Sequence, residues 1–194
     1  MLKRSSVLPE LKLISSNFAK KRKKIWDICI YGSFVRGKIK SNDIDIAIIL
    51  KEPLCVNKKL EIAQELRSHL KELEHEFDVK CVDIKDFIDP SFMAGAGIIG
   101  EGFLLVKGRK LSEVLGFKSY AIFTYNLKNL TNSEKVMFNY SLNGRRGESG
   151  LLDITNSEHI GSGVLKTPVE KSEEFKEFFE KHKIDFKMSK SLFY

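Results

Sequence analysis

The chain has 194 residues, 42% of them hydrophobic and 30% charged, which is typical of a globular protein with a buried core. No apolar stretch approaches the roughly 18 residues of a membrane-spanning helix. The three cysteines, Cys29, Cys55 and Cys81, are widely spaced and form no Cys-x-x-Cys pair, so we expect free thiols and a cytoplasmic protein.

The formal net charge of +7 is unevenly distributed along the chain. Residues 1–26 carry a net +7, residues 27–106 a net −4, and residues 107–194 a net +4. An acidic central segment suits metal binding, and basic flanking segments are compatible with a polyanionic partner.

The first predicted elements are a helix and a strand. Apolar residues recur at helical spacing from Leu8 to Phe18, with Pro9 expected in the first turn. The basic run that follows, residues 20–24, either contacts nucleic acid or places cations where they favour the helix dipole. Residues 25–31 then read as a buried strand.

The most informative pattern comes directly after that strand. A Gly32-Ser33 turn opens a short predicted helix over residues 34–40, and Asp43 and Asp45 begin a predicted strand over 43–50. Side chains at i and i+2 of a strand point to one face, so the two carboxylates stand side by side, which repulsion disfavours unless a cation binds between them. Carboxylate oxygens suit Mg²⁺, and a Gly-Ser turn offers N–H groups and a hydroxyl to phosphate.

The next elements are a helix and a strand that carries a further acid. Apolar residues at helical spacing predict a helix over residues 60–77, and residues 79–84 form the next predicted strand. Asp83 interrupts this apolar strand, and burying a carboxylate without a partner is costly. We therefore favour Asp83 as a functional residue over its neighbours Asp78 and Asp86, which we interpret as turn or surface residues.

Residues 95–100 match the glycine pattern of a dinucleotide-binding loop, but they follow a turn at Asp89-Pro90 instead of a strand. We expect a glycine-weakened helix there, followed by a short strand over residues 103–106. A change of pattern near residues 108–118 predicts a boundary between domains 1–116 and 117–194.

The second predicted domain is small and basic. Capping-box patterns begin helices at Thr131 and Thr167, and the first of these helices ends at Asn143-Gly144. Predicted strands and helices alternate as β-α-β-β-α-β, which suggests a two-layer α+β domain of ferredoxin-like type. The strands are expected at residues 120–127, 151–155, 164–166 and 185–188. A basic loop, residues 143–147, is either a phosphate-gripping loop or a solvated turn.

The order Gly32-Ser33, Arg36-Gly37, Asp43-x-Asp45 resembles the signature of polymerase β-like nucleotidyltransferases, in particular the small members called minimal nucleotidyltransferases. The resemblance covers about the first 115 residues. The gap before Asp43 is one residue shorter than in the small members, and Asn42 replaces the usual serine. The resemblance implies an α/β (α+β) fold with a mixed sheet flanked by helices.

The resemblance also implies a mechanism and a set of ligands. Asp43, Asp45 and, as the matching third carboxylate, Asp83 would bind two Mg²⁺ ions, or Mn²⁺, and Asp83 would accept the proton of the attacking hydroxyl. Gly32 and Ser33 would bind the phosphates of a nucleoside triphosphate, and Arg36 would neutralise the leaving pyrophosphate.

We therefore expect a Mg-dependent enzyme that moves a nucleoside monophosphate, favouring AMP, onto a hydroxyl of RNA or protein. Two alternatives stay open. One is a non-catalytic nucleotide- or RNA-binding module, and the other is an antitoxin that adds AMP to a partner toxin. In each case, residues 117–194 are expected to bind the acceptor or partner, and no membrane association is expected.

Overall fold

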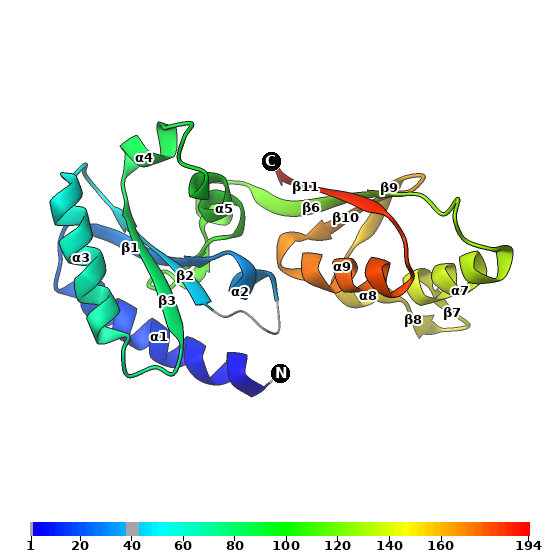
Figure 1. The fold of residues 1–194 in the computed structure, drawn as a ribbon, viewed down its shortest axis with the longest axis horizontal. Helices are drawn as coiled ribbons and strands as arrows, with labels where there is room; N and C mark the ends of the chain where they lie inside the picture. The colour runs from blue at the N-terminus through cyan, green and yellow to red at the C-terminus, as the bar shows by residue number, and fades with distance from the viewer. Residues whose placement is uncertain (1, 38–42) are drawn as a thin grey trace. The chain divides into compact units, whose positions relative to one another are not determined.

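The computed structural model describes residues 2–37 and 43–194, and for residues 2–6 it describes only the backbone (Figure 1). The chain divides into two compact units, the first ending at Gly116 and the second comprising Phe117–Tyr194. Within the part of the chain that is described, no helix is both long and apolar enough to cross a membrane.

The first unit is a five-stranded sheet with helices on both faces (Figure 1). Its strand order is β3-β2-β1-β4-β5, in which β2 and β3 run parallel and the other neighbours run antiparallel. The elements are α1 (Leu2–Lys20), β1 (Ile25–Tyr31), α2 (Ser33–Arg36), β2 (Asp43–Leu50), α3 (Val56–His69), β3 (Glu76–Val82), α4 (Ile84–Ile88), α5 (Ala94–Glu101), β4 (Phe103–Leu104), β5 (Arg109–Lys110) and α6 (Leu111–Val114).

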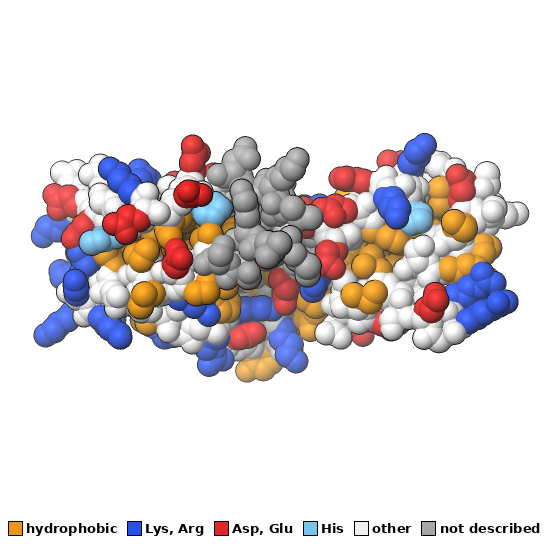
Figure 2. Space-filling model, turned by 90° about the horizontal axis from the view of Figure 1, so that it is seen from below, with side chains coloured by type: hydrophobic (Ala, Val, Ile, Leu, Met, Phe, Trp, Pro, Cys, Tyr) orange, Lys and Arg blue, Asp and Glu red, His pale blue; other side chains and the backbone are white. Residues whose placement is uncertain are grey.

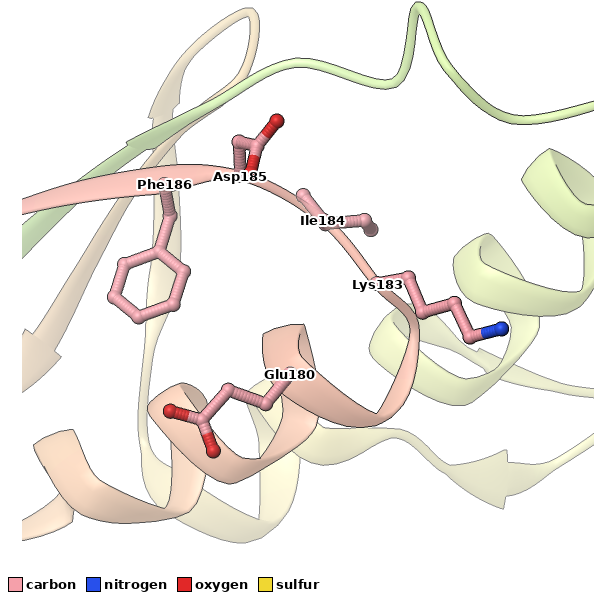
Figure 3. Close-up of a pocket in the computed structure, with 5 residues that line it drawn as sticks. All are labelled: Glu180, Lys183, Ile184, Asp185 and Phe186. Atoms are coloured by element: carbon pink, nitrogen blue, oxygen red, sulfur yellow. The ribbon is translucent and has the colours of Figure 1, made fainter.

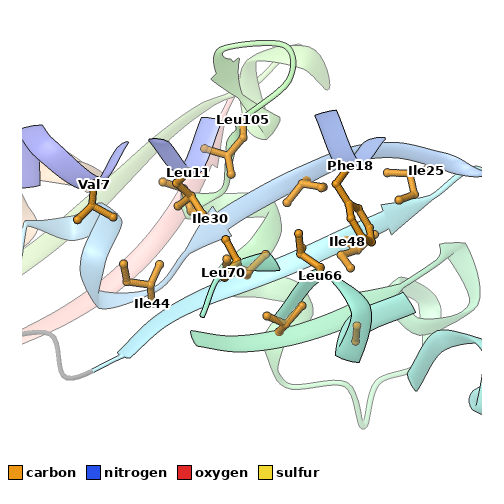
Figure 4. Packing of buried hydrophobic residues seen from close by; sticks show 14 of the residues in the cluster. Val7, Leu11, Phe18, Ile25, Ile30, Ile44, Ile48, Leu66, Leu70 and Leu105 are labelled. Atoms are coloured by element: carbon orange, nitrogen blue, oxygen red, sulfur yellow. The ribbon is translucent and has the colours of Figure 1, made fainter. Parts of the chain in front are cut away.

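Both faces of this sheet are buried, which explains why β1 and β2 read as nearly continuous apolar runs. Alternate side chains of β2 point to opposite faces of the sheet. Ile44, Ile46 and Ile48 pack with α1 and α3 in the cluster drawn in Figure 4. Ala47 and Ile49 belong to the cluster on the other face, to which Ile98 of α5 contributes. The mixed sheet between helices confirms the predicted fold class.

The structure corrects several predicted boundaries in this unit. The first helix begins earlier than predicted, so Pro9 lies inside α1 and not in its first turn. Helix α3 ends at His69, and a turn leads into β3, which begins at Glu76 and ends at Val82. Asp83 therefore follows the strand and caps α4. Of the predicted helix 34–40, residues 38–40 lie outside the described part of the chain.

The second unit is a four-stranded antiparallel sheet with strand order β11-β6-β10-β9 and a separate hairpin, β7-β8. Its main elements follow the predicted β-α-β-β-α-β order of a ferredoxin-like domain, with the hairpin and α8 added after the first helix. The elements are β6 (Lys118–Tyr125), α7 (Asn132–Asn143), β7 (Gly144–Arg145), β8 (Glu148–Ser149), α8 (Leu151–Thr155), β9 (Glu158–Gly161), β10 (Val164–Pro168), the 3₁₀ helix η1 (Val169–Lys171), α9 (Ser172–Lys181) and β11 (Phe186–Phe193).

An aromatic core joins the helices to one face of this second sheet. Phe123 of β6 packs against Phe175 and Phe179 of α9, with ring centroids 5.7 and 5.5 Å apart. Phe138 of α7 is fully buried in the same cluster. The connection from α9 to β11 borders an open hollow lined by Glu180, Lys183, Ile184, Asp185 and Phe186 (Figure 3).

Two predictions for this unit are wrong, and one is confirmed. The capping box at Thr131 is present, with Thr131 and Glu134 exchanging hydrogen bonds at the start of α7. Residues 151–155 form a helix and not a strand, an ambiguity that short apolar runs do not resolve by their pattern. Thr167 is buried in β10, where its hydroxyl accepts from Ser157 Oγ at 2.7 Å, so it caps no helix.

Candidate functional site

The turn between β1 and α2 brings the backbone against a carboxylate. Gly32 has φ 75° and ψ −151°, a conformation that is essentially restricted to glycine. A Cβ atom at this position would overlap Oδ2 of Asp45. The glycine therefore allows the Asp45 carboxylate to lie directly against the turn, with Ser33 beginning the next helix.

Three neighbouring strands place polar side chains at one level of the sheet. Tyr31 of β1 is the register partner of Asp45 in β2, and Asp45 is in turn the partner of Asp78 in β3. Asp43 lies two residues before Asp45 on the same face of β2 and is exposed, whereas Asp45 is half-buried. The structure thus brings Asp43 and Asp45 together with Asp78.

The pKa of Asp45 is raised above its ordinary value. Burial raises the pKa, and the negative charges of Asp43 and Asp78 raise it further. The positive charges of Lys80 and Arg36 oppose the rise without cancelling it. The Asp45 carboxylate therefore occupies a position where negative charge is disfavoured.

Lys80 provides a cation at this cluster. Its Nζ lies 2.8 Å from Oδ2 of Asp78, two residues away on β3. The hydrogen bond to Asp78 raises the pKa of Lys80, against the effect of burial, and the charges of Tyr31 and Asp45 add to the rise. Burial also raises the pKa of the Tyr31 hydroxyl at the same place.

Arg36 reaches the site from α2 and is held by a carboxylate from α5. Its Nη1 lies 2.6 Å from Oε2 of Glu101, a residue 65 positions further along the chain, whose side chain is 1% exposed. An ion pair with one buried member fixes the guanidinium more firmly than an exposed pair would. The sequence motif predicts a functional role for Arg36, but nothing in the sequence pattern pairs it with Glu101.

Asp83 does not join the carboxylates of β2, contrary to the prediction. Because β2 and β3 run parallel with Asp45 beside Asp78, Asp83 lies five residues further along β3, roughly 16 Å away at strand spacing. Its carboxylate accepts from the backbone N–H groups of Lys85 and Leu54 and pairs with Lys59 Nζ at 2.8 Å. These contacts assign Asp83 a structural role, capping α4 and joining it to α3.

Asp78 was considered in the sequence analysis and interpreted as a turn or surface residue. Two signals could have selected it. Asp78-Val79 begins an apolar alternation, as Asp43-Ile44 does, and Asp83 stands three residues before Asp86 in the spacing of a capping box. The first pattern places Asp78 in a strand, and the second places Asp83 at the start of a helix.

Residues 14–104 match the family described as polymerase beta nucleotidyltransferase. This segment is a polymerase beta nucleotidyltransferase domain. It contains the turn at Gly32, both aspartates of β2, Asp78, Arg36 and Glu101. A search of curated proteins gave no match to the chain.

Several solved structures resemble this nucleotidyltransferase domain. One is the tri-AMPylated Shewanella oneidensis HEPN toxin in complex with MNT antitoxin, 21% identical over 50% of this chain and 71% of that one, with a TM-score of 0.35. Another is a toxin-antitoxin structure with AMP-PNP, 27% identical over 55% of this chain and 78% of that one, with a TM-score of 0.38.

The acidic residues of the domain fit a hard divalent cation by their chemistry. Asp43, Asp45 and Asp78 offer only carboxylate oxygens, the donors that Mg²⁺ prefers. A cation would relieve the repulsion that raises the pKa of Asp45. Across the described residues, no three His, Cys, Asp or Glu side chains already converge on one point as a metal site would require.

Proposed function

We propose that the first unit transfers a nucleoside monophosphate, with AMP favoured, from a nucleoside triphosphate to a hydroxyl of a macromolecular acceptor. The observation that carries this proposal is the register of β2 and β3, which sets Asp45 beside Asp78 at the glycine turn of a nucleotidyltransferase domain. Paired carboxylates next to a phosphate-binding turn are what a metal-assisted phosphoryl transfer requires.

In this reaction, the acceptor oxygen attacks the α-phosphorus and forms the new P–O bond. The bond from that phosphorus to the bridging oxygen breaks, and pyrophosphate leaves with the electron pair. Asp43, Asp45 and Asp78 would hold a divalent cation, which would supply charge neutralisation at the reacting oxygens. We assign to Asp78 the role predicted for Asp83, so the acceptor proton passes to Asp78 or to solvent.

The remaining residues bind and orient the nucleotide. The backbone at Gly32 and the hydroxyl of Ser33 are proposed to hydrogen-bond phosphate oxygens, as the N–H groups and hydroxyls of such a turn can. Arg36 is proposed to neutralise charge on the pyrophosphate, with Glu101 fixing the guanidinium. Glu101 is thus a positioning residue.

The test is a transfer assay with each α-labelled nucleoside triphosphate and Mg²⁺. Separate reactions receive an RNA with a free 3′ hydroxyl, cell-extract protein, or no acceptor. We expect label on one acceptor class, release of pyrophosphate, and a loss on the order of 10³-fold in Asp45→Asn and Asp78→Asn. Asp83→Asn is the matched control, since it changes an aspartate of the same segment that lies away from the turn.

Two outcomes would reject parts of the proposal. If no acceptor is labelled while nucleotide still binds, the domain is a non-catalytic nucleotide-binding module. If Asp83→Asn abolishes transfer while remaining folded and Asp78→Asn does not, Asp83 is the third carboxylate after all.

A further inference from the structure

The sheet of the second unit has one face that its own helices do not use. Phe123 of β6 and Leu165 of β10 point into the core formed with α7, α8 and α9. Residues that alternate with them belong to the opposite face. We call this the open face and define it by Tyr120, Ile122, Thr124, Lys166, Lys187 and Phe193.

An aromatic and cationic cluster lies on this open face. The rings of Tyr120 and Phe193 meet edge to face, with centroids 5.4 Å apart. Lys166 Nζ lies 4.8 Å from the Tyr120 centroid and 5.3 Å from that of Phe193, and it also pairs with Glu158 of β9. Phe193 as a whole residue remains 38% exposed, so a flat ligand can contact it at the edge of the cluster.

Charge separates the two layers of this unit. Strands β6, β10 and β11 contain four lysines, of which Lys118, Lys166 and Lys187 lie on the open face, and no acidic residue, while β9 adds Glu158. Helix α9 contains four glutamates and two lysines. The face of the molecule drawn in Figure 2 mixes acidic and basic side chains, so net charge alone does not identify a binding surface. The separation of charge between the three strands and α9 identifies one, because a polyanion is attracted to the strands and repelled by α9.

We propose that the open face binds single-stranded nucleic acid. Lysines on a sheet attract the phosphates, and accessible rings stack on unpaired bases, a combination that recurs in four-stranded sheets that bind RNA. A duplex keeps its bases stacked inside and cannot use the rings. The binding itself does not depend on transfer by the first unit, but if transfer to RNA occurs, this face would recruit the acceptor.

Fluorescence anisotropy of the full chain with labelled oligonucleotides of about 12 nucleotides tests the proposal. The probes are a mixed-sequence RNA, the same sequence as DNA, and the RNA annealed into a duplex. We expect the single strands to bind at least tenfold more tightly than the duplex. The affinities of the RNA and of the DNA of the same sequence show which of the two nucleic acids this face prefers.

Variants separate the open face from other basic surfaces. Phe193→Leu keeps an apolar side chain but removes the ring, and it should weaken binding about tenfold, because a leucine side chain cannot stack on a base. Lys166→Ala with Lys187→Ala should also reduce the slope of log affinity against log salt by about 1.4, corresponding to two phosphate contacts. Lys176→Ala with Lys181→Ala on α9 is the control and should bind like the wild type.

Three results would overturn the proposal. The first is no binding by any single strand, which would leave a protein as the better partner for this face. The second is equal affinity for the duplex. The third is loss of binding in Arg145→Ala with Arg146→Ala, at the β7-β8 hairpin, together with unchanged binding in Phe193→Leu. Melting curves of each variant show whether a weaker affinity reflects binding or unfolding.

Discussion

Substitution of Gly32 by alanine tests the geometry on which the site depends. The φ and ψ of Gly32 lie in a region that costs other residues about 1–3 kcal/mol. The added Cβ would also overlap Oδ2 of Asp45, but that atom ends a short side chain that can rotate away. We therefore expect Gly32→Ala to lower the free energy of unfolding by about 1–3 kcal/mol and to turn the Asp45 carboxylate from the turn.

Gly97→Ala is a matched control in the same unit. Gly97 lies inside α5, and a Cβ there would meet only Cδ2 of Tyr31, at an ordinary contact distance of 3.8 Å. Replacing glycine by alanine inside a helix stabilises by about 0.5–1 kcal/mol. The same added methyl group should therefore change stability in opposite directions at the two positions.

Urea unfolding followed by Trp26 fluorescence measures both effects. Trp26 is the single tryptophan of the chain and lies in β1, so its signal reports on the unit that contains Gly32. A second measurement, the rise in melting temperature with Mg²⁺ and a non-hydrolysable nucleotide, should decrease in Gly32→Ala and persist in Gly97→Ala. If Gly32→Ala is as stable as the wild type and keeps the full ligand shift, the proposed contact between the turn and Asp45 is wrong.

The contacts of Asp78, Asp83 and Glu101 lead to three further predictions. Asp78→Asn should lose most of the melting-temperature rise produced by Mg²⁺ and nucleotide, whereas Asp83→Asn should keep it; the reverse result would exchange their roles. Burial raises the pKa of Asp83, but hydrogen bonds from Lys59 and two backbone N–H groups outweigh it and lower the pKa below 3.8. The stability that ionised Asp83 contributes is therefore fully present above the pKa of an ordinary aspartate and is lost as pH falls through the lowered pKa. The urea midpoint of Asp83→Asn should accordingly lie below that of the wild type near neutral pH, and the two midpoints should become equal in acid. Glu101→Gln should weaken the nucleotide-induced shift by releasing Arg36 but leave Mn²⁺ binding, measured without nucleotide, unchanged.

The local pattern of the sequence was sufficient to predict the centre of the nucleotidyltransferase domain. β1 and β2 begin and end where predicted, because strands buried on both faces read as continuous apolar runs bounded by polar turns. The glycine turn and the Asp43-x-Asp45 pair follow from this, since both lie next to those strands. These features depend on residues close together in the chain.

The place of the proposed third carboxylate depends on tertiary structure, which sets the register of β3 against β2. Leu73 and Phe77 continue the helical spacing of α3, so the pattern extended the helix and placed the next strand too late. In the structure, both residues still pack against the same core, Leu73 from a turn and Phe77 from β3. Burial requires only that a side chain is apolar, so the same spacing is compatible with a helix or with a turn followed by a strand. The earlier start of β3 sets Asp78 beside Asp45 and moves Asp83 to the cap of α4.

Contacts between distant segments were equally beyond the reach of the sequence. The ion pair of Arg36 with Glu101 joins residues 65 positions apart, and the cluster of Lys166 with Tyr120 and Phe193 joins three strands. The sequence shows which charged and aromatic residues the chain contains and how they are spaced. Which of them meet is set by strand register and by the packing of helices on the sheet, and these are properties of the folded chain alone.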